Sequence, residues 1–358
     1  MNLFVSRRVL ALALTAVVCG SLTACKPGSD SGSGSAMLSG AGSTFVYPVM
    51  TRWIEQYSQA HTGTQINYQS IGSGGGIEQV KNKTVDFGAS DAALTDAQLQ
   101  TMPAVVQIPE SAGPVCLTYN LPGFTGTLQL SPATLAGMFL GTIKTWSDPA
   151  VAKDNPGARL PGLPVVIVHR ADGSGTTAIF TDYLAAVSPV WKSKVGAGKS
   201  VSWPLGLGGK GSEGVTGQLR QSPGAIGYVE LTYAEQNKLP EIKVENAAGA
   251  FVAPTAAGST AAINAFATQL AQDPRASIVN PPASAKDAYP ISGLTFLILP
   301  KDGPDKTRRT ALKGFVRYII SDGQTVAGSL NYAPLPDNMK QYDAAQLKLL
   351  TAAGQPLP

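Results

Sequence analysis

Short apolar runs alternate with longer amphipathic runs along most of this 358-residue chain. The short runs are rich in β-branched or aromatic residues, as buried strands are, whereas the longer ones repeat apolar side chains every three to four residues, as helices do. The predicted strands are residues 65–68, 85–87, 115–119, 164–168, 225–229 and 294–299, and the predicted helices are residues 77–81, 177–187 and 310–321. Such alternation is typical of an α/β protein.

The chain is long enough for two domains, and its 44% apolar and 14% charged residues are typical of a globular protein. No Pro/Gly linker divides it into consecutive halves, so we expect two discontinuous lobes. The chain would leave the first lobe near residues 115–120 and return near 294–299. Two crossing segments act as a hinge, with a ligand cleft between the lobes. We predict lobe 1 at 37–117 and 294–358, and lobe 2 at 118–293.

The N-terminus has the composition of an export signal. Two arginines precede an apolar run at residues 9–18, which is too short for a membrane span. The sequence Leu-Thr-Ala-Cys that follows resembles a bacterial lipobox and predicts a signal peptide at 1–24 and lipidation of Cys25. An incidental cysteine near a simple cleavage site is the alternative. The Ser/Gly-rich residues 25–36 would form a tether. We therefore expect an exported protein, lipid-anchored in the periplasm or cell envelope.

Charge and cysteine content argue against several classes of function. The net charge of +4 falls to about +2 without the signal peptide, and no basic run contains interleaved aromatics, so nucleic-acid binding is not expected. Cys116 lies in an apolar, strand-like segment and is expected to be buried. With no second cysteine or histidine near it, neither metal ligation nor thiol catalysis is supported. We expect no metal and no cofactor.

The clearest chemical signal is the sequence Arg-Ala-Asp-Gly-Ser-Gly-Thr at residues 170–176. It lies between a predicted strand and a predicted helix and therefore forms a strand-to-helix turn. Such a turn directs backbone N–H groups, hydroxyls and the Arg170 guanidinium toward one point, which is how proteins hold an anion.

Three further turns have the same character. They are residues 40–45, followed by an amphipathic helix, the glycine-rich residues 71–76, and residues 85–91, which end in Ser90 and Asp91. Taken singly, they could be a helix cap, a flexible loop and another helix cap. Together with Arg170 they predict a largely uncharged polar cage with one cation, which suits a small tetrahedral anion.

A carboxylate in such a cage is unexpected, because it repels an anion about 4 Å away by roughly 4 kcal/mol at an effective dielectric near 20. A protonated phosphate removes this cost by donating a hydrogen bond to the carboxylate, whereas sulfate at neutral pH has no proton to donate. An aspartate facing the ligand would therefore select phosphate over sulfate. Asp172 lies two residues from Arg170 and is expected to brace it, so we assign proton acceptance to Asp91.

The motifs AGSTF, IGSGGG, VDFGASD and RADGSGT are highly specific in combination. With segments 141–155, 202–215, 223–234 and 331–338, they resemble the periplasmic phosphate-binding proteins of bacterial high-affinity phosphate ABC transporters. The resemblance implies a type II periplasmic-binding-protein fold, two α/β lobes joined by two hinge segments, with dehydrated phosphate in the cleft. The phosphate ligands that it implies are Thr44, Phe45 through its backbone N–H, Ser73, Asp91, Arg170, Ser174, Gly175 and Thr176, with Asp172 supporting Arg170.

The resemblance also implies a monomer that is not an enzyme and that delivers phosphate to membrane permease subunits. This sequence departs from the family at two positions, since Ser43 and Gly74 stand where relatives often have alanine and serine. Neither change removes an implied ligand.

Two other functions stay open. One is a binding protein for sulfate, molybdate or another oxyanion. The other is an exported phosphohydrolase with Ser73 or Ser174 as nucleophile, which is disfavoured because the chain has no G-x-S-x-G elbow and only two histidines. Residues 206–211 match the dinucleotide pattern G-x-G-x-x-G but lack its strand and helix context, so we expect a loop of the second lobe there.

Overall fold

This computed structural model describes residues 35–102 and 104–358, so the predicted signal peptide and Cys25 lie outside the described residues. The strands are β1 (Ala36–Gly42), β2 (Thr64–Ser70), β3 (Phe87–Ser90), β4 (Val105–Asn120), β5 (Leu128–Leu130), β6 (Val166–Arg170), β7 (Leu207–Gly209), β8 (Ala225–Glu230), β9 (Ile242–Glu245), β10 (Phe251–Val252), β11 (Ser292–Pro300), β12 (Thr351–Ala352) and β13 (Gln355–Pro356). The helices are α1 (Tyr47–Ala60), α2 (Ser73–Lys81), α3 (Asp96–Thr101), α4 (Pro132–Phe139), α5 (Pro149–Asp154), α6 (Gly175–Val187), α7 (Pro189–Lys194), α8 (Gly211–Gln221), α9 (Leu231–Gln236), α10 (Ala256–Ala265), α11 (Ala267–Gln272), α12 (Lys306–Ile320), α13 (Gly323–Ser329) and α14 (Asp337–Leu347). The predicted α/β class is confirmed.

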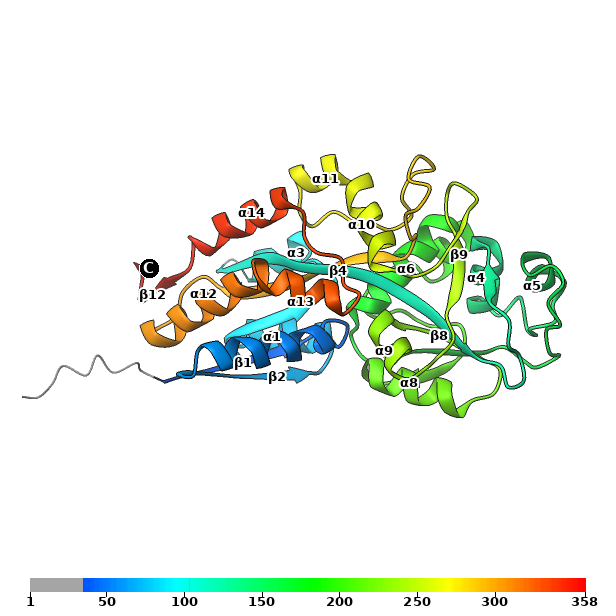
Figure 1. The fold of residues 1–358 in the computed structure, drawn as a ribbon, viewed down its shortest axis with the longest axis horizontal. Helices are drawn as coiled ribbons and strands as arrows, with labels where there is room; N and C mark the ends of the chain where they lie inside the picture. The colour runs from blue at the N-terminus through cyan, green and yellow to red at the C-terminus, as the bar shows by residue number, and fades with distance from the viewer. Residues whose placement is uncertain (1–34, 103) are drawn as a thin grey trace, which may run out of the picture. The chain divides into compact units, whose positions relative to one another are not determined.

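One mixed sheet runs through the described chain, with the strand order β2-β1-β3-β11-β4-β8-β6-β7. Its central member is β4, a strand of 16 residues that crosses Figure 1 in teal. Residues 105–114 of β4 pair with β11, whereas residues 115–120 pair with β8, both antiparallel. The strand therefore joins one group of strands around β1 to another around β6. The boundaries of the two lobes stay a prediction.

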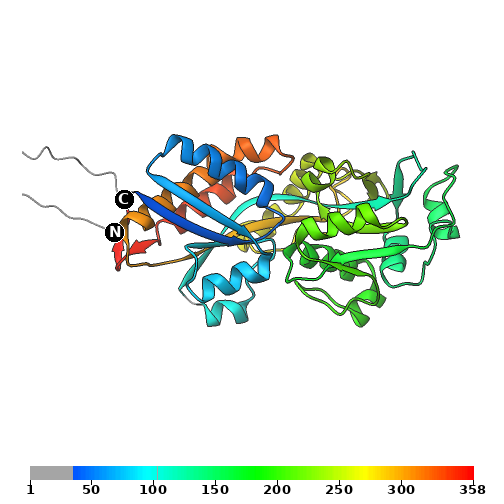
Figure 2. The same cartoon turned by 90° about the horizontal axis from the view of Figure 1, so that it is seen from below.

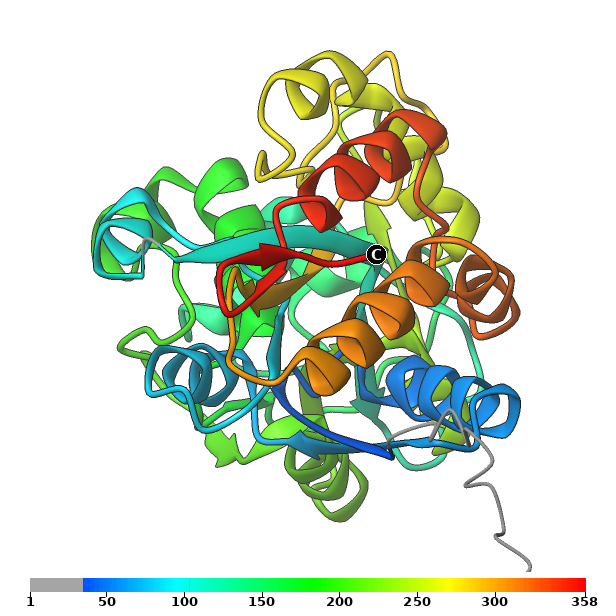
Figure 3. The same cartoon turned by 90° about the vertical axis from the view of Figure 1, so that its left-hand side faces the viewer.

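Helices cover both faces of the first strand group. On one face α1 and α12 pack through Trp53 and Phe315 against Phe87 and the odd-numbered apolar residues of β11, in the largest apolar cluster. On the other face, Ile77 of α2 packs with Ile298, the β11 residue that lies between Leu297 and Leu299. This alternation follows from the two-residue period of a strand. In Figure 3, α1 (blue) and α12 (orange) lie on the same side of the sheet.

The second strand group has the same layered construction. Phe180 and Tyr183 of α6 pack on one face with Ile226, whereas Val215 of α8 packs on the other face with Val229. These helices can be followed in green on the two sides of the strands in Figure 2. Parallel strands covered on both faces are apolar throughout, which is why residues 225–229 were recognisable as a buried strand from their composition.

Two expectations about local structure need correction. The glycine-rich run was expected to precede a helix at residue 77, but α2 begins at Ser73, after Gly72 with a φ of 86°. A glycine adopts this conformation without the steric cost that other residues meet, so the helix starts four residues early. Residues 206–211 were expected to form a loop, yet Leu207–Gly209 is strand β7, which pairs with β6 at the sheet edge, and Gly211 opens α8.

Candidate functional site

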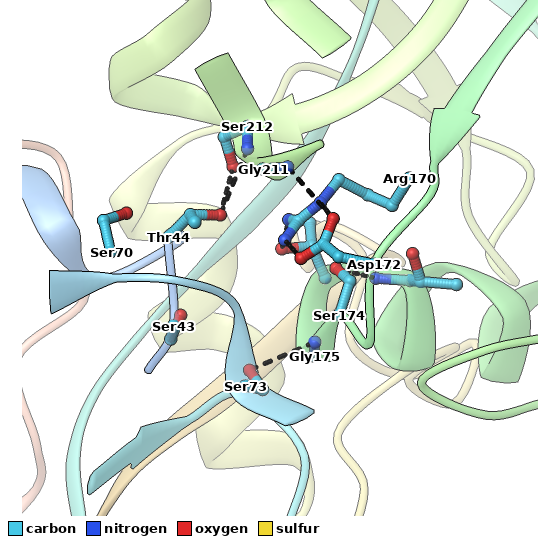
Figure 4. Close-up of polar contacts among 12 residues, drawn as sticks. Ser43, Thr44, Ser70, Ser73, Arg170, Asp172, Ser174, Gly175, Gly211 and Ser212 are labelled. Carbon is cyan, nitrogen blue, oxygen red and sulfur yellow. Dashed lines mark hydrogen bonds and ion pairs between the residues drawn. The ribbon is translucent and has the colours of Figure 1, made fainter. Parts of the chain in front are cut away.

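The residues predicted to bind the ligand all lie where a strand ends or where the following helix begins. Figure 4 shows five of them, Thr44, Ser73, Arg170, Ser174 and Gly175. Thr44 and Phe45 follow β1, Ser73 opens α2, Asp91 follows β3, Arg170 ends β6, and Ser174, Gly175 and Thr176 form the cap and first turn of α6. Their side chains are buried. The site is therefore built from three turns of the first strand group, after β1, β2 and β3, and from the β6–α6 turn of the second.

Five of these residues form one hydrogen-bonded network. The Ser73 hydroxyl oxygen accepts the backbone N–H of Gly175 at 3.1 Å and that of Asp91 at 3.2 Å. Thr176 Oγ1 lies 3.5 Å from Asp91 Oδ2 and 3.5 Å from Arg170 Nη1. The structure thus brings together Ser73 and Asp91 from one strand group with Arg170, Gly175 and Thr176 from the other.

The other three predicted ligands have different partners. Thr44 Oγ1 lies 2.9 Å from Ser212 Oγ and accepts the Ser212 N–H at 3.2 Å. The Phe45 N–H donates to Ser43 Oγ at 3.0 Å. The Ser174 hydroxyl caps α6 by accepting the N–H of the third helical residue at 3.0 Å. The hydroxyls of Thr44 and Ser174 and the N–H of Phe45 are thus already engaged with protein groups.

Arg170 is held in place by Asp172. The guanidinium donates from Nε to Oδ1 at 2.7 Å and from Nη2 to Oδ2 at 2.5 Å, and the Gly211 N–H donates to Oδ1 at 3.0 Å. Burial opposes ionisation of Asp172, but the hydrogen bonds and charge of Arg170 outweigh it and lower the pKa of this carboxyl. Two parallel hydrogen bonds fix the plane of the guanidinium and leave its Nη1 edge on the Thr176 side.

Asp91 is a buried carboxyl that collects several donors. Burial raises its pKa to about 6, against the opposing effects of the Ser43 hydrogen bond, the Arg170 charge and the hydrogen bonds of Thr295 and Ser73. Asp91 is therefore mostly ionised at pH 7 and acts as a hydrogen-bond acceptor. It does not cap the next helix, since Thr95 caps α3 through a capping box.

Four residues of this site were not found from the sequence. Ser43 donates its hydroxyl to Asp91 Oδ1, and Thr295 Oγ1 lies 3.1 Å from the same oxygen and 3.0 Å from Glu110 Oε1. Ser212 contacts Thr44 from the start of α8. The unusual serine at position 43 was visible in its motif but its partner was not. Glu110, Thr295 and Ser212 lie outside the turns that carried the signal.

Three tyrosines fix the turn at residues 43–45. The hydroxyls of Tyr68, Tyr233 and Tyr332 donate to its three consecutive carbonyls, at 2.9, 2.8 and 2.7 Å respectively. Tyr233 belongs to α9, which follows β8 of the second strand group. With every carbonyl engaged, the peptide planes of the turn are held in one orientation before any ligand arrives, and preorganised donors of this kind lower the cost of binding.

The site combines two helix N-termini, several hydroxyls, one guanidinium that is paired with Asp172, and the further ionised carboxyl of Asp91. Such a set of donors around one carboxylate suits a small oxyanion that still carries a proton. The contacts of the two histidines are with other residues: His169 stacks on Trp203 at 4.7 Å, with Nδ1 3.0 Å from the Arg170 carbonyl, and His61 stacks on Tyr57 at 4.0 Å. Among residues 35–102 and 104–358, no three His, Cys, Asp or Glu side chains cluster as metal ligands, and no helix is long and apolar enough to cross a membrane.

Comparison with known proteins places the chain in a family. A family model described as a PBP superfamily domain matches residues 27–323. The phosphate-binding protein PstS of Xylella fastidiosa (strain Temecula1) is 45% identical over 312 residues, which cover 87% of this chain and 85% of the relative. PstS of Pasteurella multocida is 42% identical, with 87% and 90% covered.

A solved structure of a high-affinity periplasmic phosphate-binding protein, PfluDING with bound phosphate at pH 8.5, superposes with a TM-score of 0.69. It is 24% identical, and the superposition covers 86% of this chain and 93% of that one. The likeness confirms the predicted two-lobe, type II periplasmic-binding-protein fold. With two relatives above 40% identity over most of their length, the chain belongs to the PstS family of phosphate-binding proteins.

Proposed function

We propose that this protein captures inorganic phosphate between its two lobes and delivers it to an ABC-type phosphate import permease. One observation carries the choice of ligand: the ionised carboxyl of Asp91 lies buried in a network that otherwise consists of donors. An anion without a proton meets repulsion from this carboxyl, whereas phosphate donates its proton to it. The names of the relatives and the family membership support the same ligand.

The proposed ligands are Thr44, Phe45, Ser73, Asp91, Arg170, Ser174, Gly175 and Thr176, with Asp172 bracing Arg170. Arg170 supplies the one positive charge, and hydroxyls and backbone N–H groups supply the remaining donors. A bound phosphate would take over donors that now serve the protein itself, such as the Gly175 N–H on Ser73 and the Phe45 N–H on Ser43. Because these donors come from both strand groups, the ligand would hold the lobes together.

Ligand choice is tested by thermal unfolding with competing anions. We expect phosphate and arsenate, each at about 100 times its Kd, to raise the melting temperature by several degrees, because ligand at that excess stabilises the folded state by about 2.7 kcal/mol. Sulfate at the same concentration should leave the melting temperature unchanged. Equal stabilisation by sulfate would assign the protein to another oxyanion, and sustained release of phosphate from an ester would favour a hydrolase.

We propose further that the protein is exported, that Cys25 carries the lipid that anchors it to a membrane, and that it works as a monomer with the permease subunits as partners. The lipobox-like sequence before Cys25 supports the anchor. In a bacterial host, a Cys25→Ala variant should leave the membrane fraction and appear in the soluble envelope fraction, measured by blotting after fractionation. Retention of the variant on the membrane would contradict lipidation at this residue.

A further inference from the structure

A second buried carboxyl lies behind Asp91, on the side away from Arg170's turn. Glu110 belongs to β4 and its side chain is fully buried. Thr295 of β11 lies between the two carboxyls, with its hydroxyl oxygen 3.1 Å from Asp91 Oδ1 and 3.0 Å from Glu110 Oε1. The Thr295 hydroxyl therefore bridges the two carboxyls.

A threonine hydroxyl carries one proton, so it can donate to only one of these two carboxyls. The other carboxyl must itself carry a proton and donate it to Thr295, or two negative oxygens would compete for one donor in a buried place. Asp91 has other donors in Ser43 and Ser73, and it is attracted by the charge of Arg170. Glu110 Oε2 has no hydrogen-bond partner among the described residues. The proton is therefore better placed on Glu110.

The surroundings of Glu110 agree with this assignment. Burial raises its pKa to about 8, and the charge of Asp91 adds to the rise against the hydrogen bond of Thr295. The titratable groups that act on it are Asp91, at the end of β3, and Tyr68 of β2, whose pKa is raised by burial together with the charges of Glu110 and Asp91. At pH 7 Glu110 is thus mostly a neutral acid, while Asp91 is mostly ionised.

We propose that Glu110 is a positioning residue that keeps Asp91 an acceptor: the neutral acid donates to Thr295, and the Thr295 hydroxyl in turn donates to Asp91. This inference rests on the proposed function, because it names what holds Asp91 ready for the proton of phosphate. When Glu110 loses its proton, Thr295 is drawn to the new carboxylate and a second negative charge faces the site. This charge opposes the binding of phosphate, which carries two negative charges when it has one proton.

The test is the pH dependence of binding. We would measure the Kd for phosphate by calorimetry between pH 7.5 and 9.5 at constant ionic strength, where phosphate stays mainly in a form with one proton. We expect the wild-type affinity to fall by about tenfold over this range as Glu110 ionises. The Glu110→Gln variant cannot ionise and its amide still donates to Thr295, so its affinity should stay constant over the same range.

The matched control is Asp343→Asn. Asp343 of α14 is also fully buried, burial raises its pKa to about 9, and neither of its oxygens has a hydrogen-bond partner among the described residues. No hydrogen bond joins its carboxyl to Asp91 in the part of the chain that the structure describes, so the control should retain the wild-type fall in affinity. If Glu110→Gln shows the same fall as the wild type and the control, the role of Glu110 is overturned.

A second pair of variants tests the hydroxyl between the two carboxyls. Thr295→Val keeps the shape but removes the hydroxyl, and we expect it to lower the ratio of phosphate to sulfate affinity at pH 7.5 by about tenfold. Thr295→Ser should restore the ratio, and Glu110→Gln should add no further change to Thr295→Val. An unchanged ratio in Thr295→Val would overturn the inference. Failure of the wild type itself to bind phosphate would instead overturn the proposed function.

Discussion

Replacing Asp91 with asparagine is expected to reduce the preference for phosphate over sulfate by about 100-fold or more, because a buried group that rejects the wrong ligand accounts for discrimination of this size. The carboxylate accepts a proton that only phosphate offers, whereas the asparagine amide can donate to either anion. The variant should gain sulfate binding and lose phosphate binding. Calorimetric titration of both anions at pH 7.5 measures the change in the ratio of their dissociation constants.

Asp172→Asn is the matched control for this prediction. Asp172 is the other carboxyl of the site, but its two oxygens are engaged by Arg170 and the Gly211 N–H. Its replacement loosens the guanidinium, which interacts with any oxyanion, so we expect both affinities to fall in parallel and their ratio to persist. Should Asp91→Asn also leave the ratio unchanged, Asp91 would have no part in selectivity.

The second large effect is expected for Gly175→Ala. A Cβ at this position would lie 2.6 Å from the Cβ of Asp91 and 2.7 Å from its backbone N, closer than carbon atoms pack. Asp91 is held by its own hydrogen bonds, so the clash would push the α6 turn away from it. Overpacking of this kind costs about 1 to 3 kcal/mol, which corresponds to a loss of about 5- to 150-fold in phosphate affinity. Isothermal calorimetry with phosphate measures it.

Gly217→Ala separates this clash from a general effect of replacing glycine. Gly217 lies within α8, and a Cβ there would have no atom within 4 Å. We expect wild-type phosphate affinity and a free energy of unfolding higher by up to about 1 kcal/mol, because alanine is the better helix former. If Gly175→Ala binds phosphate as tightly as Gly217→Ala does, the contact between α6 and Asp91 is not part of the bound state.

The strand-to-helix turns of the site were accessible from the sequence because each carries its own signal within a few residues. The turn from Arg170 to Thr176 combines a preceding β-branched run, a guanidinium and hydroxyls, and no distant residue is needed to recognise it. The extent of β4 was less accessible. Pro109, Glu110 and Pro114 interrupt its apolar pattern, so only residues 115–119 were predicted for a strand that begins at Val105.

The residues that were missed depend on pairing between distant parts of the chain. Thr295 meets Glu110 across 185 positions because β11 lies beside β4, and Ser212 meets Thr44 across 168 positions. A single sequence contains no local trace of either pairing. Glu110 by itself also resembles an ordinary surface glutamate, and only its position in the middle of the sheet makes it a buried acid.

The long strand β4 also determines the order in which the protein can fold. β3 pairs with β11, about 200 residues later in the chain, and the first ten residues of β4 pair with β11 as well. Until residues 292–300 are synthesised, both strands present open edges, and closing so large a loop is slow. The chain therefore cannot complete this sheet until residues 292–300 are available to pair. A fragment that ends before β11 would be prone to aggregation, not a smaller functional protein.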